Sequence, residues 1–370
     1  MIIIKGKYNE AKVFTSDLEG TARDQIQTLV NQPFTADSKI RIMPDVHAGA
    51  GSTIGTTMTV TDAIVPNLVG VDIGCGMLTS KLAEDAIDLP KLDQLIRRLI
   101  PSGHEIRKKP HDFLQYVDVD KLRCREGGKN DKSLKMERAR LSLGTLGGGN
   151  HFIEGNKDED GRLYLVIHSG SRHLGLQVAL FYQHLAAKRR PDLPSDLACL
   201  QGQDMKDYLH DMHIMQQYAV YNRKAMADII ISGMGWDVEE SFTTIHNYID
   251  LDSMILRKGA VSARRGEKLL IPLNMRDGSL ICVGKGNSDW NQSAPHGAGR
   301  IMSRTEAKRT LTLHDYKDAM EGIYSTSVHR STLDEAPMAY KSLDSLREYL
   351  HETVDVFAHI RPIYNFKAAD

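Results

Sequence analysis

Apolar residues recur at helical spacing in four stretches of the chain. In the stretch 89–100, Leu92, Ile96 and Leu99 fall on one side of a helix, and the letters PSG that follow end the pattern. The same period continues through the stretches 174–188, 203–231 and 342–354. These stretches predict four amphipathic helices, and the last of them leads into an extended tail at 359–366.

The predicted strands are short apolar runs bordered by glycine. They cover 39–43, 57–60, 162–167, 241–245, 268–273 and 279–283. Strands and helices mix without regular alternation, which predicts the α+β class. No internal repeat or change of composition marks a boundary, so we expect a single domain over 1–370. The polar segment 119–138 is predicted to be an exposed loop or lid.

Composition and charge exclude several classes of protein. The chain has 370 residues with 47 Lys+Arg against 48 Asp+Glu, so any affinity for nucleic acid must come from a local basic patch. The four cysteines lie far apart without a recurring spacing, which favours a reducing compartment. No apolar run has the length of a signal sequence or a membrane span, so we expect a cytoplasmic protein without membrane contact.

Six segments share an unusual pattern in which glycines surround a single His, Asp, Cys or Asn. They are MPDVHAGAGSTIG (43–55), GVDIGCGM (70–77), LGTLGGGNHFIE (143–154), VIHSGSRHLG (166–175), IHNYID (245–250) and SAPHGAGRIMSR (293–304). Glycine permits tight turns and a close approach of the backbone to a ligand. The repetition of this pattern therefore favours a functional site over packing.

These segments contain one thiol, one carboxylate and three imidazoles that suit a metal site: Cys75, Asp72, His151, His168 and His246. The mixture fits Mn²⁺, Zn²⁺, Fe²⁺ or Co²⁺, and a thiolate shared between two ions is one possible arrangement. A single His or Cys is more often structural than a metal ligand, so the prediction of a metal site rests on all five residues together. Nearby cations that suit phosphate are Arg172, Lys258, Arg300 and Arg304.

His296 differs from the other histidines because the letters GAG follow it directly. We expect the backbone amides after His296 to form an anion-binding nest for a phosphate. An imidazole held beside such a nest is a candidate covalent nucleophile.

Taken in order from Met43 to the C-terminus, the six motifs resemble the RtcB family of GTP-dependent RNA ligases. The resemblance implies an α+β domain with mixed or antiparallel sheets around a central metal and nucleotide cleft, flanked by helices. It implies that Asp72, Cys75, His151, His168 and His246 hold two Mn²⁺ ions, with Cys75 as the bridge. It also implies that His296 becomes covalently guanylylated.

The resemblance assigns further roles by position. Contacts to GTP would come from Asn150, Glu154, Asn274, Ser279, Gly297, Ala298, Gly299 and Lys367. The RNA phosphate path would be lined by Arg172, Lys258, Arg300 and Arg304. Asp45 matches an acidic residue needed in ligation, so its loss is expected to spare formation of His–GMP more than sealing.

The implied reaction joins an RNA 2′,3′-cyclic phosphate or 3′-phosphate end to a 5′-hydroxyl end through His–GMP and an activated 3′ end. The length of the chain is similar to a compact bacterial subgroup found beside peptide-release-factor homologues, which implies repair of cleaved rRNA or tRNA. An archease-type activator is a further partner that the resemblance suggests.

The chain departs from the family pattern at three places. Leu256 stands where the family commonly has His, and Pro295 stands where Cys is frequent. The segment 272–279 replaces a stretch resembling PGSMGTAS, so nucleotide contacts there are expected to differ, and Arg276 is expected to affect closure of the pocket.

Two other functions remain open from the sequence. One is a two-metal phosphodiesterase that opens cyclic phosphates without sealing, and the other is a non-catalytic RNA-end sensor. Neither has a reason to retain the HGAGR segment together with Lys367. Several other histidines are predicted to be solvated on helices: His184, His210, His213, His314 and His351.

Overall fold

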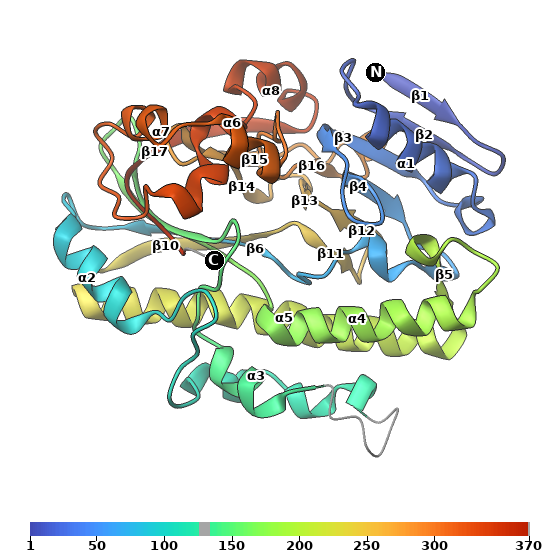
Figure 1. Ribbon diagram of the computed structural model, residues 1–370, viewed down its shortest axis with the longest axis horizontal. Coiled ribbons are helices and arrows are strands. Elements are labelled where there is room, and N and C mark those ends of the chain that lie inside the picture. Colours follow the sequence, from blue (N-terminus) through green and yellow to red (C-terminus); the bar gives the residue numbers. More distant parts are fainter. Residues whose placement is uncertain (126–133, 369–370) are drawn as a thin grey trace.

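The computed structural model describes residues 1–125 and 134–368, and it contains two large sheets (Figure 1). The first has the order β1 (Ile2–Lys5), β2 (Glu10–Val13), β3 (Ile40–His47), β4 (Ile54–Thr59), β12 (Ile255–Lys258), β11 (Asn247–Asp250). The second has the order β10 (Val238–Ile245), β6 (Gly76–Leu82), β8 (Leu163–Ser169), β7 (Phe152–Lys157), β17 (Val354–Lys367), β15 (Gly278–Gly284), β14 (Lys268–Asn274). Neighbouring strands in these two sheets are antiparallel except β2 and β3, which confirms the predicted α+β class.

Two short ribbons, eight α-helices and nine short 3₁₀ helices complete the described part of the fold. The ribbons pair β13 (Ala260–Ser262) with β16 (Ser293–Pro295) and β5 (Ala63–Ile64) with β9 (Leu200–Gln201). The helices are α1 (Gly20–Val30), α2 (Leu89–Leu99), α3 (Met136–Ser142), α4 (Arg172–Arg189), α5 (Gly202–Met234), α6 (Arg304–Thr310), α7 (Leu313–Ala319) and α8 (Leu343–Leu350). Figure 1 shows α4 and α5 as a long layer beneath the sheets.

The helix α2 shows how local sequence sets an element. Asp88 caps its start by accepting a hydrogen bond from the N–H of Lys91 at 3.0 Å, and Pro90 occupies the first turn, where no N–H partner is lost. Leu92 and Ile96 are buried on its inner side. The predicted helices at 89–100, 174–188 and 203–231 are confirmed as α2, α4 and α5.

The C-terminal region differs from its prediction. The helix expected at 342–354 ends at Leu350, and β17 begins at Val354 rather than near His359. Val354 pairs with Gly284 of β15. Pairing within the sheet therefore overrides the helical sequence pattern at this end of the predicted helix. The sequence pattern also missed β6 and β7, because their residues are buried almost throughout and show no polar alternation.

Part of the segment 119–138 is packed against the helical layer instead of being exposed. Val119, Leu122 and Cys124 are buried. The buried carboxylate of Asp211 on α5 accepts hydrogen bonds from the N–H groups of Arg123 and Cys124 at 2.8 and 2.9 Å. The prediction of an exposed loop is therefore wrong for Val119, Leu122 and Cys124, whereas Asp120, Lys121, Arg123 and Arg125 are exposed, and residues 126–133 lie outside the described part.

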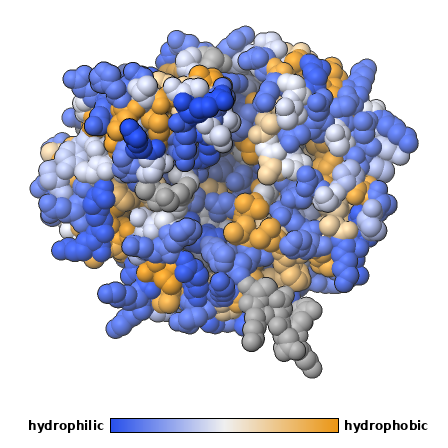
Figure 2. All heavy atoms as spheres, viewed as in Figure 1, coloured by the Kyte–Doolittle hydropathy of each residue, from blue (hydrophilic) through white to orange (hydrophobic). Residues whose placement is uncertain are grey.

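The surface in Figure 2 is mainly hydrophilic, with small hydrophobic groups scattered over it and a hollow near the middle of this face. None of the helices in residues 1–125 and 134–368 combines the length and the hydrophobicity that crossing a bilayer requires. The histidines predicted to be solvated are exposed, except His210, which is half-buried and donates to Asp211 at 3.0 Å.

Candidate active site

Four neighbouring strands of the second sheet bring the predicted metal donors together. Cys75 directly precedes β6, His168 lies on β8, His151 directly precedes β7, and His246 directly follows β10. The strands β10, β6, β8 and β7 are adjacent in that order, so these four residues meet at one end of the sheet. Asp72 joins them from the turn before β6.

The donor atoms lie close enough to share metal ions. The Sγ of Cys75 is 3.3 Å from Nε2 of His168 and 3.5 Å from Nε2 of His151. The Nε2 of His151 is 3.1 Å from Oδ2 of Asp72. Two groups of possible metal ligands result. One contains Cys75, His168 and His246, and the other contains Asp72, Cys75 and His151. Cys75 belongs to both groups.

Backbone carbonyls orient two of the imidazoles. The Nδ1–H of His151 donates to the carbonyl of Leu146 at 2.9 Å, and that of His168 donates to Asn150 at 3.1 Å. In both rings the Nε2 lone pair is left facing Cys75, which is the usual arrangement of a ligand histidine. The buried Nδ1 of His246 has no hydrogen-bond partner among the described residues, and a metal ion would satisfy it.

Electrostatics of the cluster agree with cation binding. Burial lowers the pKa of His168 and of His246 well below the ordinary value, so both rings are neutral. Burial, and then Asp72, raise the pKa of Cys75 well above its usual range. Burial alone would raise the pKa of Asp72, but His151 and Arg172 outweigh it and hold the value at about 2. A thiolate at Cys75 therefore needs a cation beside it.

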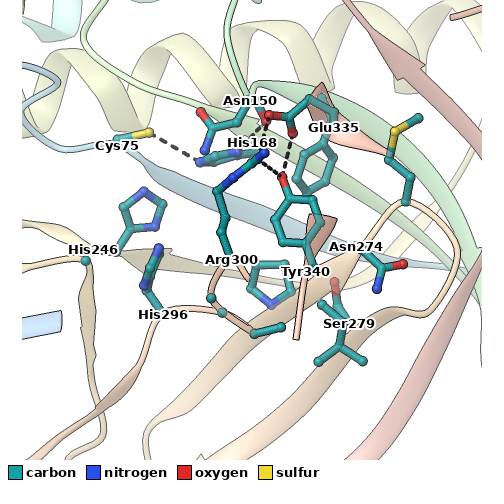
Figure 3. A pocket seen from close by; sticks show the side chains of 18 of the residues that line it. Cys75, Asn150, His168, His246, Asn274, Ser279, His296, Arg300, Glu335 and Tyr340 are labelled. Atoms are coloured by element: carbon teal, nitrogen blue, oxygen red, sulfur yellow. Dashed lines mark hydrogen bonds and ion pairs between the residues drawn. The ribbon is translucent and has the colours of Figure 1, made fainter. Parts of the chain in front are cut away.

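His296 lies next to this cluster and is held by Asp45. Its ring Nδ1 donates to Oδ2 of Asp45 at 2.7 Å, and its backbone N–H donates to the same oxygen at 3.2 Å. The rings of His296 and His246 are 5.3 Å apart, and Figure 3 shows them side by side. Because Nδ1 carries the hydrogen in this contact, Nε2 has a free lone pair.

A cavity of about 320 Å³ contains most of the predicted site residues. The metal donors Asp72, Cys75, His168 and His246 line it, and so do His296 and Arg300 (Figure 3). All predicted nucleotide contacts line it as well: Asn150, Glu154, Asn274, Ser279, Gly297, Ala298, Gly299 and Lys367. His151 and Asp45 do not line the cavity. His151 contacts the lining residue Cys75, and Asp45 contacts the lining residue His296.

Comparison with known proteins identifies the family. Residues 25–368 match the model of the family described as tRNA-splicing ligase RtcB. The chain is 35% identical to the RNA-splicing ligase RtcB of Escherichia coli K12 over 384 residues, which cover 94% of each chain. It is 30% identical to the tRNA-splicing ligase RtcB of Aeropyrum pernix over 87% of this chain and 86% of the relative.

The chain belongs to the RtcB family. It is accordingly an enzyme of the RNA-ligase class, and its glycine-rich motifs are those that gather at the cavity. A second Escherichia coli relative, from strain ATCC 25922, is the RNA-splicing ligase RtcB2, which is 28% identical over 95% of this chain and 93% of its own.

The cavity also contains a cluster of buried charged groups, formed by Glu154, Glu335 and Lys367. Glu154 accepts a hydrogen bond from the amide of Asn365 at 2.6 Å, and burial raises its pKa to about 7. The ammonium of Lys367 is paired with Glu335. Burial alone would raise the pKa of Glu335, but Lys367 and Arg304 outweigh it and lower the value to about 2. A nucleobase at this end would meet a carboxyl group that loses its proton only near pH 7 and an ammonium group that is paired with Glu335.

Three of the four cations predicted to follow RNA are occupied by other contacts. The ammonium of Lys258 is buried and donates to the carbonyls of Ala50 and Asn67 and to the hydroxyl of Ser52, at 2.8 to 3.0 Å. These three acceptors use all of its N–H groups, so Lys258 joins the glycine-rich loop at Ala50 and Ser52 to the short 3₁₀ helix Pro66–Leu68. Arg304 pairs with Asp334 and Glu335 at 2.7 and 2.8 Å.

Arg300 is likewise held by protein groups, since it pairs with Glu335 at 3.5 Å and donates to the carbonyl of Met302 at 3.1 Å, whereas Arg172 does not line the cavity. Arg300 lines the cavity, donates to the carbonyl of Asp334 at 2.6 Å and stacks on Tyr340 with 5.0 Å to the ring centre. Arg172 approaches His151 at 3.4 Å from the side away from the cavity. The amide nest predicted after His296 is incomplete, because the N–H of Ala298 donates to the carbonyl of Pro272 at 3.1 Å.

The three departures from the family pattern lie in different parts of the structure. Leu256 is a fully buried residue of β12, and Pro295 ends β16, where it pairs with Ala260. In the segment 272–279, Asn274 and Ser279 line the cavity. Arg276 pairs with Asp277 at 2.8 Å and is absent from the lining, so the structure gives no contact through which it closes the pocket.

Sequence reasoning missed Glu335, Tyr340 and Phe152 as lining residues. The hydroxyl of Tyr340 donates to Glu335 at 2.8 Å, and the ring of Phe152 lies 5.8 Å from the ammonium of Lys367. Glu335 and Tyr340 come from a segment without the glycine pattern. Phe152 directly follows His151 in a recognised motif, so its position was a usable signal.

Proposed function

We propose that this RtcB-family ligase joins RNA 3′-phosphate or 2′,3′-cyclic phosphate ends to 5′-hydroxyl ends, using GTP and two Mn²⁺ ions, through a covalent His296–GMP. The contact between Asp45 and His296 beside the shared thiol of Cys75 carries the proposal. It supplies an oriented nucleophilic nitrogen next to a cation site and within a cavity of nucleotide size.

The metal ions would be held in two groups that share Cys75. His168 and His246 complete one group, and Asp72 and His151 complete the other. Thiolate, imidazole and carboxylate donors together suit Mn²⁺, Zn²⁺, Fe²⁺ or Co²⁺, and the choice of Mn²⁺ rests on the family. Bound divalent ions would neutralise negative charge on the phosphates.

The guanine base is placed at the buried end of the cavity. Its O6 accepts hydrogen bonds and its amino group donates them, so Lys367 and Glu154 are complementary to it. Asn150, Asn274 and Ser279 line the same cavity and offer amide and hydroxyl groups to the sugar and phosphates.

The reaction follows from the position of His296. Its Nε2 attacks the α-phosphorus of GTP, the bond to pyrophosphate breaks, and Asp45 keeps the proton on Nδ1 and stabilises the positive ring. An oxygen of the RNA 3′-phosphate then attacks the same phosphorus, the bond to His296 breaks, and the 3′ end carries GMP. The 5′-hydroxyl finally attacks the RNA phosphate, and GMP leaves. Where the RNA ends in a 2′,3′-cyclic phosphate, water must open it to the 3′-phosphate before that end can take GMP from His296.

The biological RNA and the protein partners are proposed from the family resemblance. We place the chain in the compact bacterial subgroup associated with peptide-release-factor homologues, and its cleaved substrates would be rRNA or tRNA. An archease-type activator is a further proposed partner. Four free, buried cysteines support a reducing, cytoplasmic location.

The decisive experiment separates this reaction from that of a phosphodiesterase that lacks sealing activity. The protein is incubated with MnCl₂ and α-labelled GTP, and acid-labile, alkali-stable label is measured on the wild type and on His296→Ala. His213→Ala, which alters an exposed histidine on α5, is the matched control. Label on the wild type and on His213→Ala alone supports the proposal. A folded, metal-loaded wild type that opens cyclic phosphates but takes up no label overturns it.

A further inference from the structure

The cavity contains one histidine that the proposed reaction does not use. Four histidines among the described residues line it, and they are His47, His168, His246 and His296. His168 and His246 belong to a candidate metal group, and His296 is the proposed nucleophile. His47 belongs to neither metal group, although it lies in the first glycine-rich motif, MPDVHAGAGSTIG. A titratable ring therefore remains free for another task.

Asp45 positions His47 as well as His296. His47 is the last residue of β3, and its ring Nδ1–H donates to the backbone carbonyl of Asp45 at 3.0 Å. The carboxylate of the same aspartate accepts from Nδ1 of His296 at 2.7 Å. Because a carbonyl oxygen only accepts, Nδ1 of His47 carries the hydrogen and Nε2 carries the lone pair. Within the described chain, no hydrogen bond occupies that Nε2.

The loop that carries His296 packs directly against the carbonyl that holds His47. Gly299 has a φ of 77°, and a Cβ there would lie 3.0 Å from the carbonyl oxygen of Asp45. Glycine at this position therefore permits the close approach of the HGAGR segment to the contact between Asp45 and His47. The two imidazoles thus lie in one part of the cavity wall.

The surroundings of His47 favour a neutral ring. Burial is the main cause that lowers the pKa of His47 from its ordinary value, and the charges of His296 and Lys341 lower it further. The hydrogen bond to the Asp45 carbonyl and the charge of the Asp45 carboxylate oppose this shift without cancelling it. A neutral imidazole with a free lone pair can accept a proton.

We propose that Nε2 of His47 takes the proton of the RNA 5′-hydroxyl in the sealing step. The inference rests on the proposed function. The 5′ oxygen forms a bond to the RNA phosphorus, the bond from that phosphorus to the oxygen of GMP breaks, and the hydroxyl proton passes to His47 and then to water. One bridging oxygen separates the RNA phosphorus from the phosphorus that left His296, so the reacting atoms lie beside both imidazoles.

The proton balance separates sealing from the two steps before it. His296 attacks GTP with a lone pair, and the RNA 3′-phosphate attacks His–GMP with an ionised oxygen, so neither step releases a proton. Sealing converts a hydroxyl into an ester and does release one. The alternative acceptor is Nε2 of His296, which is free again once GMP has moved to the RNA.

The test uses His47→Asn, because the amide of Asn can donate to the Asp45 carbonyl in place of Nδ1 but has no basic nitrogen. His213→Asn, on the exposed side of α5, is the matched control. Two single-turnover rates are measured: labelling by α-labelled GTP, and sealing of a prepared RNA that already carries GMP on its 3′-phosphate to a 5′-hydroxyl RNA. Sealing is followed from about pH 5 to 8.

His47→Asn is expected to take up label like the wild type but to seal about 100-fold more slowly or worse, the usual contribution of a general base. In the wild type the sealing rate is expected to rise with pH and to level off above the lowered pKa of His47. This inflection is expected to be absent from His47→Asn and present in His213→Asn.

Equal sealing by His47→Asn and the wild type would overturn the inference. A slower His47→Asn that keeps the inflection would overturn it as well, because a purely structural role changes the rate and not the pH profile. His296→Ala is assayed on the same prepared RNA, and an inflection lost there but kept in His47→Asn would assign the proton to His296 instead. If the wild type takes up no label, the proposed function fails, and sealing of the prepared RNA still tests His47.

Discussion

The carboxylate of Asp45 accepts two hydrogen bonds from His296, from the ring Nδ1 at 2.7 Å and from the backbone N–H at 3.2 Å. Asp45 lies on β3 of the first sheet, whereas His296 directly follows β16. One oxygen of a buried side chain thus fixes both the position and the tautomer of the ring. The nucleophilic nitrogen is Nε2 because Nδ1 is committed to Asp45.

Replacing Asp45 is therefore expected to affect the first chemical step. Asp45→Asn keeps the shape of the side chain but accepts from or donates to Nδ1, so it no longer selects one tautomer. We expect the rate of label transfer from GTP to His296 to fall about 100-fold or more. Single-turnover labelling measures this rate.

This expectation differs from the one that the family resemblance gave, which placed the loss mainly in sealing. Asp289→Asn is the control, because Asp289 is a half-buried residue that pairs with Lys12 and Arg41 and does not line the cavity. Normal labelling by Asp45→Asn together with slow sealing would favour the earlier assignment.

Cys75 is the donor common to both candidate metal groups, so its loss is expected to disturb both. In Cys75→Ser we expect binding of fewer than two Co²⁺ ions and no thiolate-to-metal charge-transfer absorption. Titration with Co²⁺, followed by absorption and calorimetry, checks this without any activity assay.

Cys199→Ser is the matched control, because Cys199 is a buried free cysteine that lies outside both groups. It is expected to bind Co²⁺ like the wild type. Two ions and an unchanged absorption band in Cys75→Ser would disprove a shared thiolate.

The raised pKa of Glu154, about 7, predicts a dependence of stability on pH. The folded protein keeps a proton that the unfolded chain releases near 4.5, so this contribution is complete below that value and falls as the pH rises through 7. Glu154→Gln has no such loss. At pH 8.5 we expect the free energy of unfolding of the variant to exceed that of the wild type by up to about 3 kcal/mol, so the variant unfolds at a higher temperature.

The surroundings of Glu154 can accept the amide. The side-chain oxygens of Asn156 and Asn365 are buried and have no hydrogen-bond partner among the described residues, so either can accept from a Gln after an amide flip. Thermal unfolding at pH 5.5 and 8.5 tests the prediction, with Glu348→Gln on the exposed side of α8 as control. A stability difference independent of pH would contradict it.

The sequence predicted the donors of the metal cluster but not the way in which the fold holds them. Glycine-flanked motifs identified Cys75 and His168, because such motifs are local and contain the functional residue itself. Glu335 was not predicted, since it comes from a segment without that pattern and reaches Lys367 only through tertiary packing. Lys258 shows the converse, because its charge suggested RNA although three buried acceptors hold it.

The helix α5 holds the segments that carry the metal ligands, and no sequence motif predicted this. Asn222 and Arg223 are successive, fully buried residues of α5. The amide of Asn222 accepts from the N–H groups of Gly144 and Thr145 at 2.8 and 3.1 Å and donates to the carbonyl of Gly170 at 3.1 Å. Asn222 therefore joins the loop that leads to His151 with the residues that follow His168.

Arg223 fixes two ligand strands in the same way. One guanidinium nitrogen donates to the carbonyl of Gly74 at 2.9 Å and to that of Ser169 at 2.7 Å. Gly74 precedes Cys75, and Ser169 follows His168, so a single side chain ties β6 to β8 at the cluster. Burial lowers the pKa of Arg223 to about 10, and the nearby Cys75 and Asp72 oppose that shift.

Arg223→Lys shortens the side chain that reaches the two carbonyls and removes the second nitrogen, which donates to the hydroxyl of Thr243 at 3.3 Å, so we expect it to lose part of these contacts. Loss of one buried hydrogen bond costs about 1–3 kcal/mol, and we expect a lower unfolding temperature and weaker binding of Co²⁺. Lys224→Met, on the exposed side of the same turn, is expected to change neither. If Arg223→Lys unfolds earlier but binds Co²⁺ as tightly as the wild type, Arg223 stabilises the fold without positioning the metal ligands.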